Sequence, residues 1–283
     1  MAIWNKLTQA YLQGNKTLFE AFMLADKDGN IINSFGIASN IPIANGDVDG
    51  YSAIHKFGRN PNIGNAPETI WMHGGKYQYL AVDSPSTVYA YSSSSDDGAG
   101  EDGARTVSIL GLDNDFNEIE ETITVNGAVS TKTFLRIYRA FVATAGSLTT
   151  NDDNILISTG AGGTGTVLAD IGLVGSGSTF GLGQTQLALY TVPAGKTGYL
   201  TTWNVGCAPM NNQATVLLKS RELDGDAPFR TKDIVDLVGG YHTQNYSIPL
   251  RFPEKTDIEV VAAGDTGTVI SSSFDIILVD NPT

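Results

Sequence analysis

Hydrophobic and polar residues alternate in many short runs from about residue 50 to the end of the chain. Alternation with a period of two places successive side chains on opposite faces of a strand, so these runs predict β-strands. The expected strands are 51–57, 77–82, 87–92, 105–111, 118–126, 132–143, 154–158, 166–170, 186–192, 197–206, 213–223, 242–250, 256–263 and 267–279. Helical patterns of 10–15 residues do not separate them, which favours an all-β fold of sandwiches or barrels over a doubly wound sheet.

The N-terminal region admits two interpretations. Residues 1–24 are the only segment with a helical pattern, carried by Trp4, Leu7, Tyr11 and Leu12 and by a capping box at Thr17–Glu20. The stretch "LFEAFMLADKDGNIINSFGIAS" instead predicts two strands that flank the turn Asp26–Gly29. An Asp-Gly pair between apolar runs is a strong hairpin signal, and we favour the hairpin.

A glycine pattern in "NILISTGAGGTGTVLADIG", residues 154–172, resembles a dinucleotide-binding fingerprint through Gly160, Gly162 and Gly165. The fingerprint requires a helix of several turns after the glycines, so that its N-terminus can approach a pyrophosphate. Further glycines follow closely, at Gly172, Gly175, Gly177 and Gly181, and "TVLADI" alternates as a strand does. We therefore expect no cofactor here, and a hairpin in which 154–158 pairs with 166–170.

"VPAGKTGYL" imitates a phosphate-binding loop at Gly195-Lys196-Thr197, but Tyr190 occupies the position of the required first glycine. Pro193 and Gly195 suit a tight turn between two strands. Two acidic stretches, "DKDGNIINSFGI" and "DNDFNEIEETIT", begin like calcium loops and lack both the central glycine and the final glutamate. Both are expected to be turns rich in Asp and Asn.

No catalytic or metal-binding residues are expected. His55, His73 and His242 lie far apart without metal-ligand spacing, and Cys207 is the single cysteine. A G-x-S-x-G nucleophile elbow is missing from the sequence. Glu120 and Glu121 are adjacent within an expected strand, so their side chains point to opposite faces and cannot converge on one bond.

Composition and charge narrow the choice of partners. The chain has 283 residues, 32 glycines and a formal net charge of −13, which disfavours nucleic-acid binding driven by phosphate contacts. No run approaches the roughly 18 apolar residues that a membrane-spanning helix needs, and "MAIWNKLTQAYLQGN" lacks the apolar centre of a signal peptide. A single cysteine fits assembly in a reducing cytoplasm.

Several segments in order resemble virion structural proteins of tailed bacteriophages, especially marine podoviruses that infect cyanobacteria and other planktonic bacteria. These segments are "DGYSAIHKFGRNPNI", "GARTVSILGLDNDFNEIEETITVNG", "FLRIYRAFVATAG", "QLALYTVPAGKTGYLTTWNV", "DAPFR", "IPLRFPEKTDIEVVA" and "FDIILVDN", and they cover most of the chain beyond residue 45. The resemblance implies a non-enzymatic, β-rich virion component of the capsid-decorating or head-fibre type. It implies no catalytic residue.

We expect an N-terminal anchoring segment at 1–45, a β-sandwich at 46–172, a Gly-rich linker at 173–185 and a jelly-roll-like sandwich at 186–283. In the last domain, Pro249 and Pro253 confine "LRF" to a sheet edge or a strand end. Jelly rolls occur in capsid-associated domains, and by analogy we expect a homotrimer that binds phage virion proteins, with the major capsid protein as first choice.

Other functions stay open. A tail, neck or fibre component is the alternative location in the virion. Such a component could bind host surface carbohydrate through aromatic side chains at Tyr77, Tyr79, Trp203 or Tyr241, although packing within the fold is the expectation that we favour for them. An enzyme such as a polysaccharide depolymerase is least favoured, since the sequence has no internal repeat of the β-helix kind.

Overall fold

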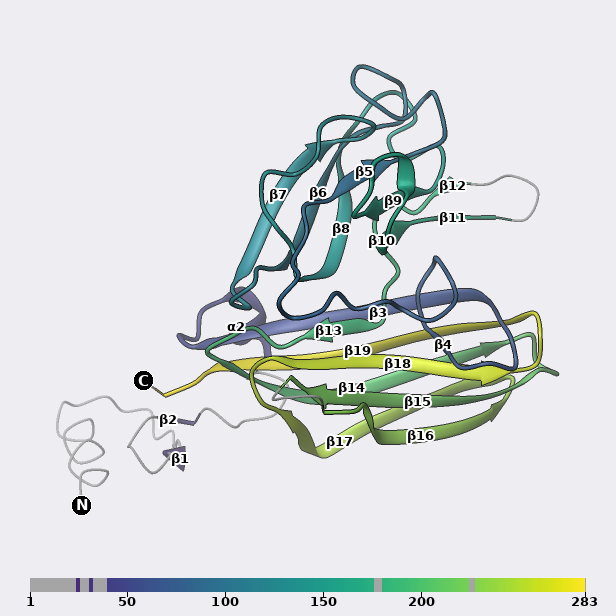
Figure 1. Ribbon diagram of the computed structural model, residues 1–283. Helices are drawn as coiled ribbons and strands as arrows, with labels where there is room; N and C mark the ends of the chain where they lie inside the picture. The colour runs from purple at the N-terminus through teal and green to yellow at the C-terminus, as the bar shows by residue number, and fades with distance from the viewer. Residues whose placement is uncertain (1–23, 26–30, 33–39, 176–179, 224–226, 283) are drawn as a thin grey trace, which may run out of the picture. The chain divides into compact units, whose positions relative to one another are not determined.

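The computed structural model describes residues 24–25, 31–32, 40–175, 180–223 and 227–282, and most of these residues form β-strands (Figure 1). The chain divides into two units, residues 1–49 and residues 50–283. The expected all-β class is confirmed, because the described chain is built almost entirely from antiparallel strands. In the part of the chain that the structure describes, no helix is both long and apolar enough to cross a membrane.

The first unit contains the expected hairpin. Strand β1 (Leu24–Ala25) pairs antiparallel with β2 (Ile31–Ile32), on either side of the turn that the sequence predicted. The alternative, a helix within residues 1–24, concerns a segment that is outside the described residues except for its last position. The favoured interpretation of this stretch therefore agrees with the strand pairing.

A short helix, α2 (Asn40–Asn45), was not expected from the sequence, which showed a helical pattern only in residues 1–24. Pro42 lies in its first turn, where a backbone N–H has no partner within the helix and its loss costs nothing. Gly46 has a φ of 76° and ends the helix, and the N–H of Asp47 donates to the carbonyl oxygen of Pro42 at 2.8 Å. A helix of six residues is too short for hydrophobic periodicity in the sequence to reveal it.

The second unit contains a jelly roll. One sheet has the order β17-β14-β19-β3, from β3 (Tyr51–Ile63), β14 (Lys196–Ala208), β17 (Gly240–Phe252) and β19 (Thr268–Asp280). The other has the order β13-β18-β15-β16, from β13 (Leu189–Thr191), β15 (Gln213–Glu222), β16 (Arg230–Val238) and β18 (Thr256–Gly264), and the short β4 (Glu68–Thr69) also pairs with β18. Renumbered along the chain, the eight main strands lie as 6-3-8-1 and 2-7-4-5, which is jelly-roll connectivity.

The first jelly-roll strand comes from the region that we expected to form the middle sandwich, 46–172. Strand β3 pairs with β19 along most of its length, from Tyr51 opposite Val279 to Ile63 opposite Thr268. The alternation within β3 marks it as a strand but carries no information about a partner more than 200 residues away. We expected two sandwiches that follow one another, at 46–172 and 186–283. The strand pairing instead gives a jelly roll that begins with β3, with the other sandwich inserted between β4 and β13.

The inserted sandwich is made of two three-stranded sheets. One contains β5 (Tyr89–Tyr91), β9 (Ile155–Ser158) and β10 (Val167–Ile171), and the other contains β6 (Ala104–Leu112), β7 (Glu118–Thr124) and β8 (Arg136–Ala145). Buried Val107, Ile109 and Ile123 from the second sheet pack with Ile157 and Leu168 from the first. The sandwich thus has a hydrophobic core of its own.

Part of the expected linker 173–185 is hydrogen-bonded structure. Strand β11 (Leu173–Val174) pairs with β12 (Phe180–Gly181), and the N–H of Thr185 donates to the carbonyl oxygen of Ala140 at 2.9 Å. Composition alone suggested a linker because glycine is common in both linkers and tight hairpins.

The hairpin expected from the glycine-rich stretch is confirmed. Strand β10 pairs antiparallel with β9, with Ala169 opposite Ile157 and Ile171 opposite Ile155. A single 3-10 turn, η2 (Ala161–Gly163), lies between them, and Gly162 and Gly165 have φ values of 66° and 75°. The glycines supply the left-handed backbone that lets the two strands reverse direction.

Two further local expectations agree with the structure. Asp113 is the first residue of a turn between β6 and β7, where its Oδ1 accepts the N–H groups of Asp115 and Asn117 at 2.9 Å. Strand β17 is an edge strand, as Pro249 predicted, and its pairing with β14 shifts register between Leu200 and Thr202.

Candidate functional site

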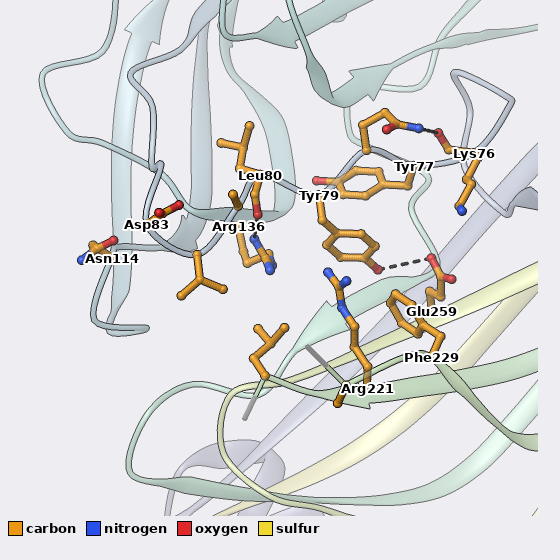
Figure 2. Close-up of a pocket in the computed structure, with 15 residues that line it drawn as sticks. Lys76, Tyr77, Tyr79, Leu80, Asp83, Asn114, Arg136, Arg221, Phe229 and Glu259 are labelled. Carbon is orange, nitrogen blue, oxygen red and sulfur yellow. Dashed lines mark hydrogen bonds between the residues drawn. The ribbon is translucent and has the colours of Figure 1, made fainter. Parts of the chain in front are cut away.

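A cavity of about 1000 Å³ lies where residues 76–83, at the start of the inserted segment, face strands β15 and β18 of the jelly roll (Figure 2). Its walls carry both aromatic and charged side chains. Those labelled in Figure 2 are Lys76, Tyr77, Tyr79, Leu80, Asp83, Asn114, Arg136, Arg221, Phe229 and Glu259.

Arg136 in the cavity wall forms a bidentate ion pair that joins the two sandwiches. Arg136 on β8 places Nε 3.0 Å from Oδ1 of Asp257 on β18, and Nη2 3.1 Å from Oδ2. Both side chains are buried. The planar guanidinium matches a carboxylate with two parallel hydrogen bonds, and this geometry fixes orientation as well as distance.

Asp257 also binds two neighbours within the jelly roll. Arg221 on β15 contacts Oδ2 through Nε at 3.0 Å and Nη2 at 2.9 Å, and the hydroxyl of Thr191 donates to Oδ1 at 2.6 Å. The Nη1 group of Arg136 donates to the carbonyl oxygens of Leu80 and Leu135, each at 2.9 Å. One buried carboxylate therefore joins strands β8, β13, β15 and β18.

Aromatic rings enclose the second arginine. The guanidinium carbon of Arg221 lies 4.7 Å from the ring centre of Tyr79 and 4.6 Å from that of Phe229, distances at which a cation is attracted to the ring face. Arg136 lies 5.1 Å from the same Tyr79 ring. Only about a quarter of the Arg221 side chain is exposed to solvent.

Glu259 extends the network along β18. The hydroxyl of Tyr79 donates to its Oε2 at 3.3 Å. Burial raises the pKa of Glu259 to about 6, and the positive charge of Lys219 opposes the shift. Burial also raises the pKa of Tyr79 well above its ordinary value, so the phenol stays a hydrogen-bond donor at neutral pH.

Other contacts also join the sandwiches. Buried Lys56 on β3 donates through Nζ to the carbonyl oxygen of Tyr138 on β8, and burial lowers the pKa of this lysine to about 7. Leu112, Phe116 and Leu135 of the inserted sandwich belong to the same hydrophobic cluster as Trp203 of the jelly roll. Arg136 and Arg221 in the cavity wall thus share the carboxylate of Asp257, and together with these contacts they hold the insertion on the jelly roll.

The aromatic residues considered for sugar stacking have different environments. Trp203 is fully buried and donates through Nε1 to the hydroxyl of Ser272 at 3.0 Å, and Tyr77 is buried with its hydroxyl on the carbonyl oxygen of Leu168. Tyr79 is half-buried against the two arginines. Tyr241 is 83% exposed. Packing, the favoured expectation, therefore describes Trp203, Tyr77 and Tyr79, and leaves Tyr241 free to meet a ligand.

The structure keeps the histidines apart. His55 contacts Asp275 at 2.6 Å, His73 contacts Asp170 at 3.4 Å, and His242 packs near the ring of Trp203. Within residues 40–175, 180–223 and 227–282, no group of three or more His, Cys, Asp or Glu side chains is placed to hold a metal ion. Cys207 is buried.

Two acidic residues of the inserted sandwich, Asp97 and Glu121, have structural roles. Asp97 is buried, and its carboxylate accepts from the hydroxyl of Ser92 at 2.6 Å and from the N–H groups of Ala104, Asp152 and Asp153. Glu121 accepts from the backbone of Thr131 and Lys132. These contacts use the carboxylates to order loops.

Sequence reasoning did not find Arg136, Asp257 or Arg221. A signal was present for the first two, since Arg136 interrupts the apolar run "FLRIYRAF" and Asp257 precedes "IEVVA". A charged residue inside a buried strand requires a partner, because an unpaired buried charge is very costly. The sequence does not say which charged residue the partner is.

Comparisons with known proteins add little to this description. No family model and no curated protein matches the chain. Solved structures that share 8% identity with it include the infectious bursal disease virus Gx strain (TM-score 0.24, covering 81% of this chain and 72% of that one) and a subviral particle of VP2 from that virus (TM-score 0.14, covering 83% and 73%). TM-scores this low do not establish a common fold, and the jelly roll described above depends on the strand order of this chain alone.

Proposed function

We propose that this chain is a non-enzymatic structural protein of a tailed-bacteriophage virion, which binds other virion subunits and decorates or stabilises the capsid. The observation that carries the proposal is the complete jelly-roll connectivity of the eight main strands, since jelly rolls build many capsid-associated domains. The order of the resembling segments along the sequence supports the same function. The major capsid protein is the proposed partner, and a homotrimer is the proposed assembly.

The junction between the sandwiches suits a structural role. A bidentate Arg136–Asp257 pair and a shared hydrophobic cluster hold the inserted sandwich on the jelly roll, which favours one fixed arrangement of the binding surfaces. Preorganised surfaces lose less conformational entropy when they bind. A protein of this kind stabilises a particle through the surface that it buries against neighbouring subunits.

The test is the location and copy number of the protein in purified virions of the phage that encodes it. Quantitative mass spectrometry against the major capsid protein, together with a reconstruction of the intact particle, is expected to show many copies on the head. One or a few copies per particle would reject head decoration and favour the alternative location in the neck, tail or fibre. Complete absence from virions would reject the proposal.

A further inference from the structure

A shallow groove of about 300 Å³ lies on the outer face of the sheet β17-β14-β19-β3. Strand register places four residues in one row across this sheet, Tyr241, Gly206, Ser271 and Arg59. The next row is Thr243, Asn204, Ser273 and Phe57. Both rows line the groove.

These side chains point away from the core. Their neighbours along the strands, Trp203, Val205 and Phe274, are buried in the jelly roll, and successive side chains of a strand point to opposite faces. Gly206 has no side chain and Ser271 has a short one, so the groove is deepest over the two central strands, β14 and β19. Larger side chains stand at its two ends, on the outer strands β17 and β3, which lie about 14 Å apart at three strand spacings.

The polar groups in the groove include both donors and acceptors. Asn204 donates through Nδ2 to the hydroxyl of Ser273 at 3.2 Å, which leaves its Oδ1 as an acceptor. Among the described residues, the side chains of Arg59, Ser271 and Tyr241 have no hydrogen-bond partner. In the following row, Nδ1 of His55 lies 2.6 Å from Oδ1 of Asp275, so these two polar groups are already paired with each other.

The polar and aromatic groups of the groove match a carbohydrate better than an apolar helix or a nucleic acid. A sugar offers hydroxyl groups to donors and acceptors and an apolar ring face to an aromatic side chain such as Tyr241. The polar floor does not suit an apolar helix, and the net charge of −13 disfavours a nucleic acid. We propose that this groove binds a carbohydrate chain that runs across the strands from Tyr241 toward Phe57 and Arg59. The proposal does not depend on where in a virion the protein is located.

The experiment uses the full chain on an array of bacterial surface polysaccharides, followed by a titration with an oligosaccharide of the polysaccharide that binds best. Wild-type protein is expected to bind saturably. Tyr241→Ala removes the stacking surface and is expected to weaken binding about tenfold. Gly206→Leu fills the floor of the groove and is expected to abolish binding. The fold accommodates the substitution, because a Cβ at this position would meet only the Ser271 carbonyl oxygen, at 4.0 Å.

Two control variants lie on the same face of the sheet but outside the groove. Tyr51→Ala removes a different exposed tyrosine from β3, and Ala53→Leu introduces a leucine side chain at an exposed position outside the groove. Both are expected to bind as the wild type does. The proposal is overturned if no polysaccharide binds saturably, or if Gly206→Leu and Tyr241→Ala bind like the controls. It is also overturned if those two variants change the oligomer mass in light scattering while no polysaccharide binds, because the face would then lie between copies of this chain.

Discussion

Arg136 and Asp257, separated by 121 positions in the sequence, form a bidentate ion pair across the junction of the two sandwiches, with Nε to Oδ1 at 3.0 Å and Nη2 to Oδ2 at 3.1 Å. Both side chains are almost completely buried. Each therefore depends on the other for the solvation that water provided in the unfolded chain. Loss of either partner is therefore expected to weaken the junction.

Asp257→Asn is expected to lower the free energy of unfolding by about 3–5 kcal/mol, because it leaves the buried guanidinium of Arg136 without a counter-charge. Arg221 would lose the same partner. Urea unfolding followed by tryptophan fluorescence measures the change. The matched control is Lys196→Ala, which breaks an exposed pair with Asp280 at 2.8 Å and is expected to cost at most about 1 kcal/mol. Equal losses in the two variants would contradict the structural role of Asp257.

Glu259→Gln is expected to stabilise the protein more at pH 7.5 than at pH 4. The pKa of Glu259 is raised in the folded state to about 6 from 4.5, so its ionisation destabilises the fold as pH rises through this window and the penalty is complete above pH 6. A glutamine keeps an acceptor for the Tyr79 hydroxyl without the charge. The difference between variant and wild type should grow by about 2 kcal/mol between the two pH values. A difference that is independent of pH would show that the carboxyl ionises normally.

Gly58→Ala is expected to disrupt the pairing of β3 within the jelly roll. A Cβ at this position would lie 2.3 Å from the Ala188 nitrogen and 2.4 Å from the Ile70 carbonyl oxygen, both of which are backbone atoms. Overpacking of this kind costs about 1–3 kcal/mol or more. Gly206→Ala is the control in the same sheet, since its Cβ meets nothing closer than 4.0 Å. A normal melting temperature for Gly58→Ala would place β3 elsewhere.

Gly165→Ala is expected to destabilise the β9–β10 hairpin more than Gly162→Ala. Both glycines have a positive φ, where an alanine costs about 1–2 kcal/mol. At Gly165 the new Cβ would also lie 2.5 Å from Oγ1 of Thr159, whereas at Gly162 it meets open space. Thermal unfolding of the two variants gives the comparison. Saturable binding of NADH that either substitution abolishes would instead restore the nucleotide interpretation.

Local geometry was predictable from the sequence where one segment contains all of the necessary information. The β9–β10 hairpin, the Asp113 turn and the position of Pro249 on an edge strand follow from turn residues and alternation within a few positions of each other. Helix α2 was not predictable, because its six residues give no periodicity. Tyr241 was among the candidate ligand-binding aromatics, but only strand register showed that Gly206, Ser271 and Arg59 stand beside it.

The sequence by itself determined that the chain is β-rich, where most strands and turns fall and which faces of the strands are apolar, because these properties depend on neighbouring residues and on backbone preferences. Tertiary structure alone decided that β3 joins the C-terminal strands, that a second sandwich is inserted after β4 and that Arg136 pairs with Asp257. Alternation marks a strand without identifying its partner, and a buried charge requires a counter-charge without specifying which one. Both choices are made when segments distant in sequence come together to bury the same core.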